Sequence, residues 1–466
     1  MKTFPKAILA VLTLLLTLAF QALPQSDTSI RLDKDIAVLR HVDPSKLSDA
    51  EQEAKAQAID AAWAEIKASG PTGTQRLKRE IEAIDKSNEK DDFFKLNAAA
   101  LLWEIGKLNE ADYIAKIWNS TPLQTQYNYV FYTAFDAAKT HDPRALPLIK
   151  AVLKNDSGGI YVAAHAMPVN WPLTQEFIWG VYGPDGLPVL NEILNTSSDR
   201  VEIVSAMIRL SRSSYLPALP KIRQLASSKD EILRGWAIRC LGIFGHPQDF
   251  AFLKAGLNLA DPRETWNYVY ALYEFDDVSI VPALIPLLST TDDRLRYELI
   301  PTLSHLTTPQ SWEALKHQFA KPRNDEEKDL LDRITNRIKG ELPANYDQLS
   351  AIKKEESFAA IRNEKYKLAK SDTVLTRQQF LEAADDWIAT SHIYGSKYEW
   401  PEERHLLAIA TSDDVPLLLK IKAALYTRLS DECLYETEMM DTVIKQLGRR
   451  RYRLGSGITA KVEGVK

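Results

Sequence analysis

The chain has few of the residues on which disulfide frameworks and metal centres depend. Its 466 residues include 2 cysteines and 8 histidines. The two cysteines, Cys240 and Cys433, stand 193 positions apart, a spacing that fits neither a disulfide framework nor a metal site. We expect Cys240 to be a small core residue, and the acidic neighbours of Cys433 disfavour a reactive thiolate. The sequence therefore predicts no metal and no cofactor.

Signatures of the common catalytic sites are also missing. The chain contains no His-Glu-x-x-His, no Gly-x-Ser-x-Gly, no phosphate-binding loop and no Cys-x-x-Cys. His405 follows Glu402 and Glu403, but a single histidine beside glutamates on a helix is more typical of a structural role. We therefore assign no catalytic residue.

Charge of one sign is not in excess either. The formal net charge is -5 with 26% charged residues, which indicates a soluble, mildly acidic protein and argues against nucleic-acid binding.

A long apolar run occurs only at the amino terminus. Lys2 and Lys6 precede an uncharged apolar run from Ala7 to Phe20, and polar residues follow up to Ser26. This order is typical of a secretory signal, and the run is shorter than the roughly 20 residues that span a bilayer comfortably. We expect residues 1–26 to export the chain to the periplasm or the cell exterior. The cleavage pattern is poor, so an uncleaved anchor that tethers the protein through residues 7–23 is the alternative.

What the sequence does contain is a period. Four aspartates, Asp199, Asp230, Asp261 and Asp292, recur every 31 residues, each before an apolar helical stretch. Aspartate at a helix start accepts hydrogen bonds from free backbone N–H groups and suits the positive end of the helix dipole. A period of this size predicts stacked helical units that bury their apolar faces against their neighbours.

The copy that starts at Asp230 shows two helices and two turns. Leu233, Ala237, Leu241 and Phe244 share one helix face, and Gly245-His246-Pro247 ends the helix. Second helices are marked by a proline in the first turn, where its missing N–H costs nothing. These marks are Leu146-Pro147, Leu187-Pro188, Leu219-Pro220 and Val281-Pro282.

This unit resembles the HEAT-like repeat first noted in phycobilisome lyases. The shared features are an Asp, an Arg four residues on, an Ala, a Leu-Gly-x-x-Gly segment and an x-Pro turn, here from Asp230 to Pro247. The resemblance covers roughly residues 95–340 and implies an all-α fold, an α-solenoid of two-helix repeats. It implies no lyase activity, because such repeats serve many unrelated tasks.

The remaining segments flank this region. Residues 27–43 are expected to be partly extended, and residues 44–94 to form a helical cap with helices at 45–69 and 72–86. Residues 341–466 are expected to form a C-terminal helical segment, and further degenerate repeats are one interpretation of it. Its last helix is expected to run from about 431 to 447 and to end at Gly448.

About ten extra residues interrupt the period near 157–183. This insertion is aromatic and carries no charged residue between Asp156 and Glu176. Insertions in repeat proteins often form a binding face, although these residues can instead fill an irregular repeat. The candidate binding residues are Tyr161, His165, Asn170, Trp171, Trp179 and Tyr182.

A basic cluster near the carboxyl end is a second candidate. Arg449, Arg450, Arg451 and Arg453 either stabilise a helix C-terminus or form a patch for an anion or a partner. The sequence thus favours an exported, non-catalytic scaffold that holds another envelope or secreted protein. The alternative is a glycan-binding or glycan-processing protein on a helical scaffold, since helical toroid glycosidases also combine aromatic residues with carboxylates.

Overall fold

The computed structural model describes residues 25–39, 49–84, 92–121, 128–155, 179–258, 261–275, 277–364, 375–390, 400–426 and 432–455. Within these ranges the chain is all-α and forms no strand, as the sequence predicted. The chain divides into two compact units, Met1–Gly158 and Gly159–Lys466, which are described separately below.

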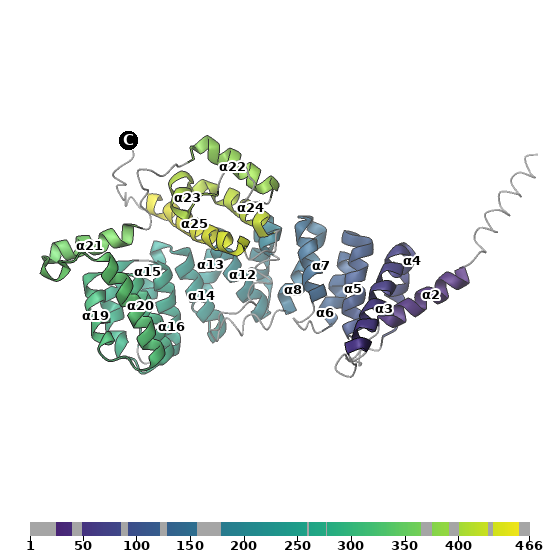
Figure 1. The fold of residues 1–466 in the computed structure, drawn as a ribbon, viewed down its shortest axis with the longest axis horizontal. Coiled ribbons are helices and arrows are strands. Elements are labelled where there is room, and N and C mark those ends of the chain that lie inside the picture. The colour runs from purple at the N-terminus through teal and green to yellow at the C-terminus, as the bar shows by residue number, and fades with distance from the viewer. Residues whose placement is uncertain are drawn as a thin grey trace, which may run out of the picture. The chain divides into compact units, whose positions relative to one another are not determined.

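The first unit is a series of helices in which each packs against helices one or two places away along the chain (Figure 1). Helix α2 lies where the sequence suggested an extended lead-in, and that expectation was wrong. The turn between α3 and α4 uses Gly70 at a φ of 55°, a conformation that favours glycine. The helices are α2 (Gln25–Val38), α3 (Asp49–Ala68), α4 (Pro71–Glu82), α5 (Asp92–Gly106), α6 (Ala111–Ser120), α7 (Asn128–Lys139) and α8 (Leu146–Asn155).

The second unit begins with helix pairs, each made of a short helix followed by a long one. The short helices are α11 (Leu187–Thr196), α13 (Leu219–Leu225), α15 (Phe250–Ala255), α17 (Val281–Leu284) and α19 (Pro309–Phe319). The long helices are α12 (Arg200–Arg212), α14 (Glu231–Phe244), α16 (Pro262–Phe275), α18 (Asp293–His305) and α20 (Asp325–Glu341). Each long helix packs against the next long helix.

The aspartates of the 31-residue period cap the long helices, as predicted. The side chains of Asp199, Asp230, Asp261 and Asp292 each accept hydrogen bonds from backbone N–H groups in the first helical turn. Asn324 continues the series and accepts from the N–H of Glu327 at 2.8 Å. The predicted prolines also lie in the first turns of α8, α11, α13 and α17. Each cap satisfies donors that the helix itself leaves free.

The core of this unit lies between the two layers of helices. Ala237, Leu241 and Phe244 of α14 are buried, and so is Cys240, as expected. Burial raises the pKa of the Cys240 thiol to about 11, which keeps it protonated. A Cβ at Gly242 would lie 2.3 Å from the backbone oxygen of Ala271. Glycine at this position therefore sets how closely α14 and α16 approach.

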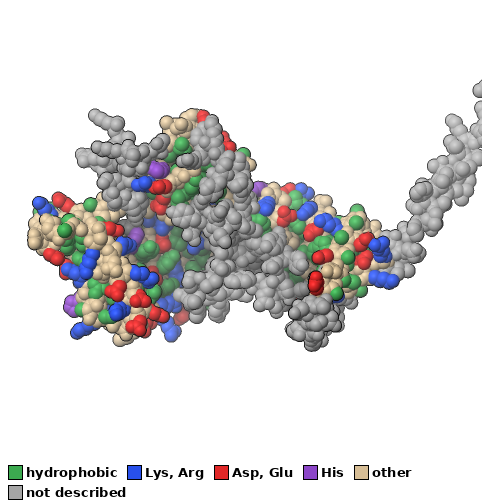
Figure 2. Space-filling view, in the orientation of Figure 1, with side chains coloured by type: hydrophobic (Ala, Val, Ile, Leu, Met, Phe, Trp, Pro, Cys, Tyr) green, Lys and Arg blue, Asp and Glu red, His purple; other side chains and the backbone are tan. Residues whose placement is uncertain are grey.

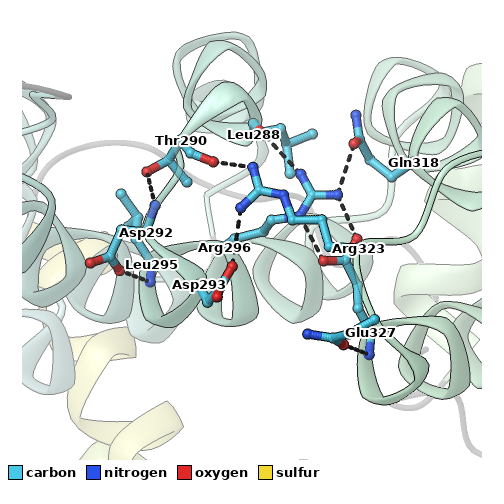
Figure 3. Close-up of polar contacts among 10 residues, drawn as sticks. Leu288, Thr290, Asp292, Asp293, Leu295, Arg296, Gln318, Arg323 and Glu327 are labelled. Carbon is cyan, nitrogen blue, oxygen red and sulfur yellow. Dashed lines mark hydrogen bonds and ion pairs between the residues drawn. The ribbon is translucent and has the colours of Figure 1, made fainter.

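A ladder of ion pairs joins successive long helices. The guanidinium of Arg200 bonds to Asp230, Arg234 to Glu264, and Arg296 to Glu327, each across 30 or 31 residues. The last pair is buried, with side chains only 4% and 7% exposed. Figure 3 shows Arg296 between the two helices, where it also donates to the oxygens of Leu288 and Gln318. Each of the three guanidinium nitrogens thus donates at least one hydrogen bond.

Apart from the buried Glu327, the charged residues at the start of α20 form a solvated face. Asp325, Glu326, Lys328 and Asp329 are exposed, and Figure 2 shows Lys and Arg side chains mixed with Asp and Glu side chains at this end of the unit.

Among the described residues, five C-terminal helices follow in the same unit, and one of them, α25 (Glu432–Gly455), packs on the long helices. The five are α21 (Ala351–Glu364), α22 (Arg377–Thr390), α23 (Glu403–Ile409), α24 (Val415–Tyr426) and α25. Helix α25 contacts α12 and α14, and these helices lie side by side in Figure 1. The prediction that α25 ends at Gly448 was wrong. Instead Gly448 lies within the helix at its contact with Ser214, where a Cβ would lie 2.5 Å from the Ser214 hydroxyl oxygen.

Removing one partner of the Arg296–Glu327 pair tests the ladder. We expect Arg296→Met to lower the free energy of unfolding by about 3–5 kcal/mol, because Glu327 is left as an unpaired buried charge. The double variant Arg296→Met/Glu327→Met should regain most of this loss. Urea denaturation followed by circular dichroism measures both changes.

The Lys316–Glu313 pair, in which Lys316 is half-buried and Glu313 is exposed, is the control at the surface. Lys316→Met should cost only about 0–1 kcal/mol. Equal losses for Arg296→Met and Lys316→Met would show that the buried pair does not hold the helices together.

Candidate functional site

Aromatic and arginine side chains from three successive long helices meet on one face of the second unit. We call this set the aromatic–arginine face. It consists of Trp236 and Arg239 on α14, Trp266 and Tyr270 on α16, and Arg294, Tyr297 and Glu298 on α18. Tyr297 is 50% exposed, Arg294 is exposed, and both tryptophans are half-buried.

Arg239 is the centre of the face. Its guanidinium carbon lies 3.9 Å from the ring centroid of Trp266 and 4.5 Å from that of Trp236. Its Nε donates to Asn267 Oδ1 at 2.8 Å. The guanidinium carbon of Arg294 lies 4.1 Å from the same Trp266 ring. Cation–π contacts contribute about 0.5–2 kcal/mol each, so these arginines fix the orientation of the Trp266 ring.

Burial changes the proton affinity of the groups around Arg239. It lowers the pKa of Arg239 to about 10 and raises the pKa of Tyr270 to about 12, with nearby Glu274 adding to the latter. At neutral pH Arg239 therefore remains a cation and Tyr270 a neutral hydroxyl.

Glu298 is the carboxyl group of the face. Burial raises its pKa, and this outweighs the hydrogen bond from Trp266 and the charges of Arg239 and Arg294, which act in the opposite direction. A carboxyl with raised pKa beside aromatic rings is a recognised mark of a functional site, although ionic networks with a structural role show it as well.

The C-terminal helix packs on the ends of the same long helices. Lys445 Nζ lies 2.6 Å from Glu274 Oε2, and Arg449 Nη2 donates to the carbonyl oxygens of Gly242 and Glu274. Gly242 and Glu274 lie in the last turns of α14 and α16, where the helices leave their carbonyls unpaired and carry partial negative charge. Two cations of α25 therefore complete the C-terminal ends of two long helices.

The structure describes two of the predicted insertion residues, and both are in the core. Trp179 and Tyr182 are 3% and 2% exposed, and their rings contact edge to face with centroids 6.4 Å apart. A Cβ at Gly186 would lie 3.0 Å from each ring. A role as surface contacts does not fit this burial, and gap-filling, the other reading of the insertion, does. Tyr161, His165, Asn170 and Trp171 lie outside the described residues.

The predicted basic patch is partly engaged inside the chain. Arg449 is 5% exposed and bonded as described above, so it is not part of an open patch. Arg450 is exposed and donates to the oxygen of Leu407 at 2.7 Å. The side chains of Arg451 and Arg453 lie outside the described residues.

Sequence analysis missed the aromatic–arginine face, although a signal was present. Trp236, Trp266 and Tyr297 follow one another at intervals of 30 and 31 residues, on the side of the long helices away from Leu241. Large aromatic residues at outward positions of consecutive repeats are the pattern that would have identified it.

The described residues contain neither a metal-ligand cluster nor a membrane-spanning helix. They contain no group of three or more His, Cys, Asp or Glu side chains placed to hold a metal ion. None of the helices in the described ranges is long and apolar enough to cross a membrane.

Comparisons with known proteins give little. The chain matches no protein-family model and no curated protein. Among solved structures it is similar to the crystal structure of an engineered protein of the Northeast Structural Genomics Consortium, with 15% identity and a TM-score of 0.31 over 73% of this chain and 95% of that one. At this TM-score the similarity adds nothing to the fold described above.

The raised pKa of Glu298 predicts a pH-dependent stability. Between the ordinary pKa of a glutamate, about 4.3, and the raised value, the folded state binds more protons than the unfolded state. The unfavourable contribution of Glu298 therefore grows as pH rises through this window. We expect Glu298→Gln to be more stable than the parent at pH 7 and equally stable near pH 4.

Urea denaturation at both pH values measures the difference. Exposed Glu326 provides the control, because Glu326→Gln should shift stability equally little at the two pH values. A Glu298→Gln variant that is less stable at pH 7 would show that the ionised carboxylate is favourable where it lies.

Proposed function

We propose that this protein is an exported, non-catalytic interaction scaffold, built as an α-solenoid of HEAT-like repeats. In this proposal the helix pairs from α11 to α20 form the repeats, and the aromatic–arginine face holds another protein of the periplasm or cell envelope. The apolar amino terminus supports export, either as a cleaved signal or as an anchor.

The composition of the aromatic–arginine face is the observation that carries the proposal. Trp, Tyr and Arg are the residues most enriched among those that dominate binding energy in protein interfaces. Here they are gathered on three consecutive helices, with Tyr297 and Arg294 open to solvent. Stacking on Arg239 and Arg294 holds the Trp266 ring in place, so less side-chain conformational entropy is lost when a partner binds this surface.

The chain itself provides a second argument. The ends of α12, α14 and α16 already accept one amphipathic helix, α25, through Lys445, Gly448 and Arg449. The long helices therefore present surfaces that bind helices, and the aromatic–arginine face lies on three helices of the same series.

A pair of surface substitutions tests the proposal. We would purify the tagged full-length protein from chemically crosslinked native cells and identify its companions by mass spectrometry. We expect a stoichiometric partner that the double variant Arg294→Glu/Tyr297→Ala retains about tenfold less or worse, since one hot-spot residue contributes about 2 kcal/mol and 1.4 kcal/mol is tenfold in affinity.

The matched control is Ile352→Ala, which removes an apolar side chain that is 73% exposed on α21. It should retain the partner fully and unfold at the parent temperature. The double variant should remain folded and unfold only slightly below the parent temperature, because it loses one cation–π contact of about 0.5–2 kcal/mol. Full retention by the double variant would exclude the aromatic–arginine face as the contact. A protein that comes without any partner would contradict the scaffold function itself.

A glycan-binding or glycan-processing function is the second candidate. The observation that favours it is Glu298, whose carboxyl pKa is raised beside Trp266, since aromatic rings and carboxyl groups together are used to hold and cleave sugars. A glycan array probed with the parent and with Trp236→Ala separates the two. A sugar bound by the parent and lost in the variant would favour this function over the scaffold.

A further inference from the structure

Four arginines are buried within the described residues, and three of them have counterparts. Arg239 donates to the side-chain oxygen of Asn267 and stacks on aromatic rings. Arg296 pairs with Glu327, and Arg449 donates to two backbone carbonyls. Arg209 on α12 is the fourth, at 6% exposed. Within the described part of the chain, neither its Nε nor its Nη1 has a hydrogen-bond acceptor.

A second buried donor lies one helical turn away. Ser213 is 2% exposed, and its hydroxyl also has no hydrogen-bond partner among the described residues. The backbone N–H of Ser213 donates to the carbonyl of Arg209 at 3.0 Å, so the helical register continues through both residues. Side chains four residues apart share one helix face, and Arg209 and Ser213 are therefore neighbours.

A buried arginine without a hydrogen-bond acceptor is unfavourable, and a bound anion would remove this cost. A guanidinium stays charged at any physiological pH, and burying one without a counterpart costs several kcal/mol. Arg209 lies in the last turn of α12, where the helix dipole favours a cation only weakly. The dipole therefore offsets a small part of the cost.

The helix itself supplies no carboxylate. Glu202 is the sole acidic residue of α12, lies seven positions before Arg209, and accepts a hydrogen bond from Ser197. We propose that Arg209 and Ser213 form a binding site for a small oxyanion, a carboxylate or a phosphate, which accepts from the guanidinium and from the hydroxyl. Charge-assisted hydrogen bonds of this kind are about twice as strong as neutral ones. This site goes beyond the scaffold function.

Thermal unfolding of the full-length protein in different sodium salts tests the site. Sodium phosphate, sodium acetate and sodium chloride are compared at equal pH and ionic strength. We expect the parent to unfold at a higher temperature in phosphate or acetate than in chloride, because an anion that binds only the folded state stabilises it. Protection by phosphate alone assigns a phosphate group, and protection by acetate assigns a carboxylate.

Two variants decide whether Arg209 is responsible. Phosphate also stabilises folded proteins generally, so the site is measured by the part of the salt difference that a variant loses. Arg209→Met should lower the salt difference clearly below that of the parent, whereas Arg263→Met, which removes an exposed arginine of α16, should keep it in full. Ser213→Ala should reduce the difference and serves in place of Arg209→Met if that variant does not fold. An unchanged salt difference in Arg209→Met or in Ser213→Ala, or a parent that unfolds equally in all three salts, would overturn the proposal.

Discussion

The contact on which the second unit depends is the capped and paired start of each long helix. An Asp or Asn caps each long helix. Each of the three ladder arginines forms an ion pair with an acidic residue near the start of the next long helix, as Arg234 does with Glu264. The cap fixes where a helix begins, and the pair fixes how far the next helix slides along it. The aspartate caps recur every 31 residues, and ion pairs join α12 to α14, α14 to α16 and α18 to α20, so a few local contacts set the register of these helices.

That register has a consequence for the surface. Positions that differ by one period lie on neighbouring helices, so outward residues form rows across the series. Trp236, Trp266 and Tyr297 form such a row, and Arg239 and Arg294 stack on the middle ring. The same pairing that stabilises the fold therefore also assembles the surface that we propose to bind a partner.

Much of the fold was predictable because its determinants are local. The caps at Asp199 and Asp230, the proline starts and the buried face of α14 each depend on residues within a few turns of one helix. The contact of Gly448 with Ser214 and the stacking of Arg239 and Arg294 on Trp266 depend on contacts between helices, which the pattern within one helix does not encode. Trp179 and Tyr182 show the same gap, since an aromatic residue in an irregular segment fits a core as well as a surface.

The contacts of α25 join residues far apart in the chain, because Arg449 donates to a carbonyl 207 positions earlier. During synthesis the long helices emerge from the ribosome well before residues 445–449. Until those residues follow, the carbonyl ends of α14 and α16 have only water to accept from. A nascent chain that lacks α25 thus exposes polar helix ends that α25 covers in the folded protein. The unit is therefore fully packed only after α25 has been synthesised.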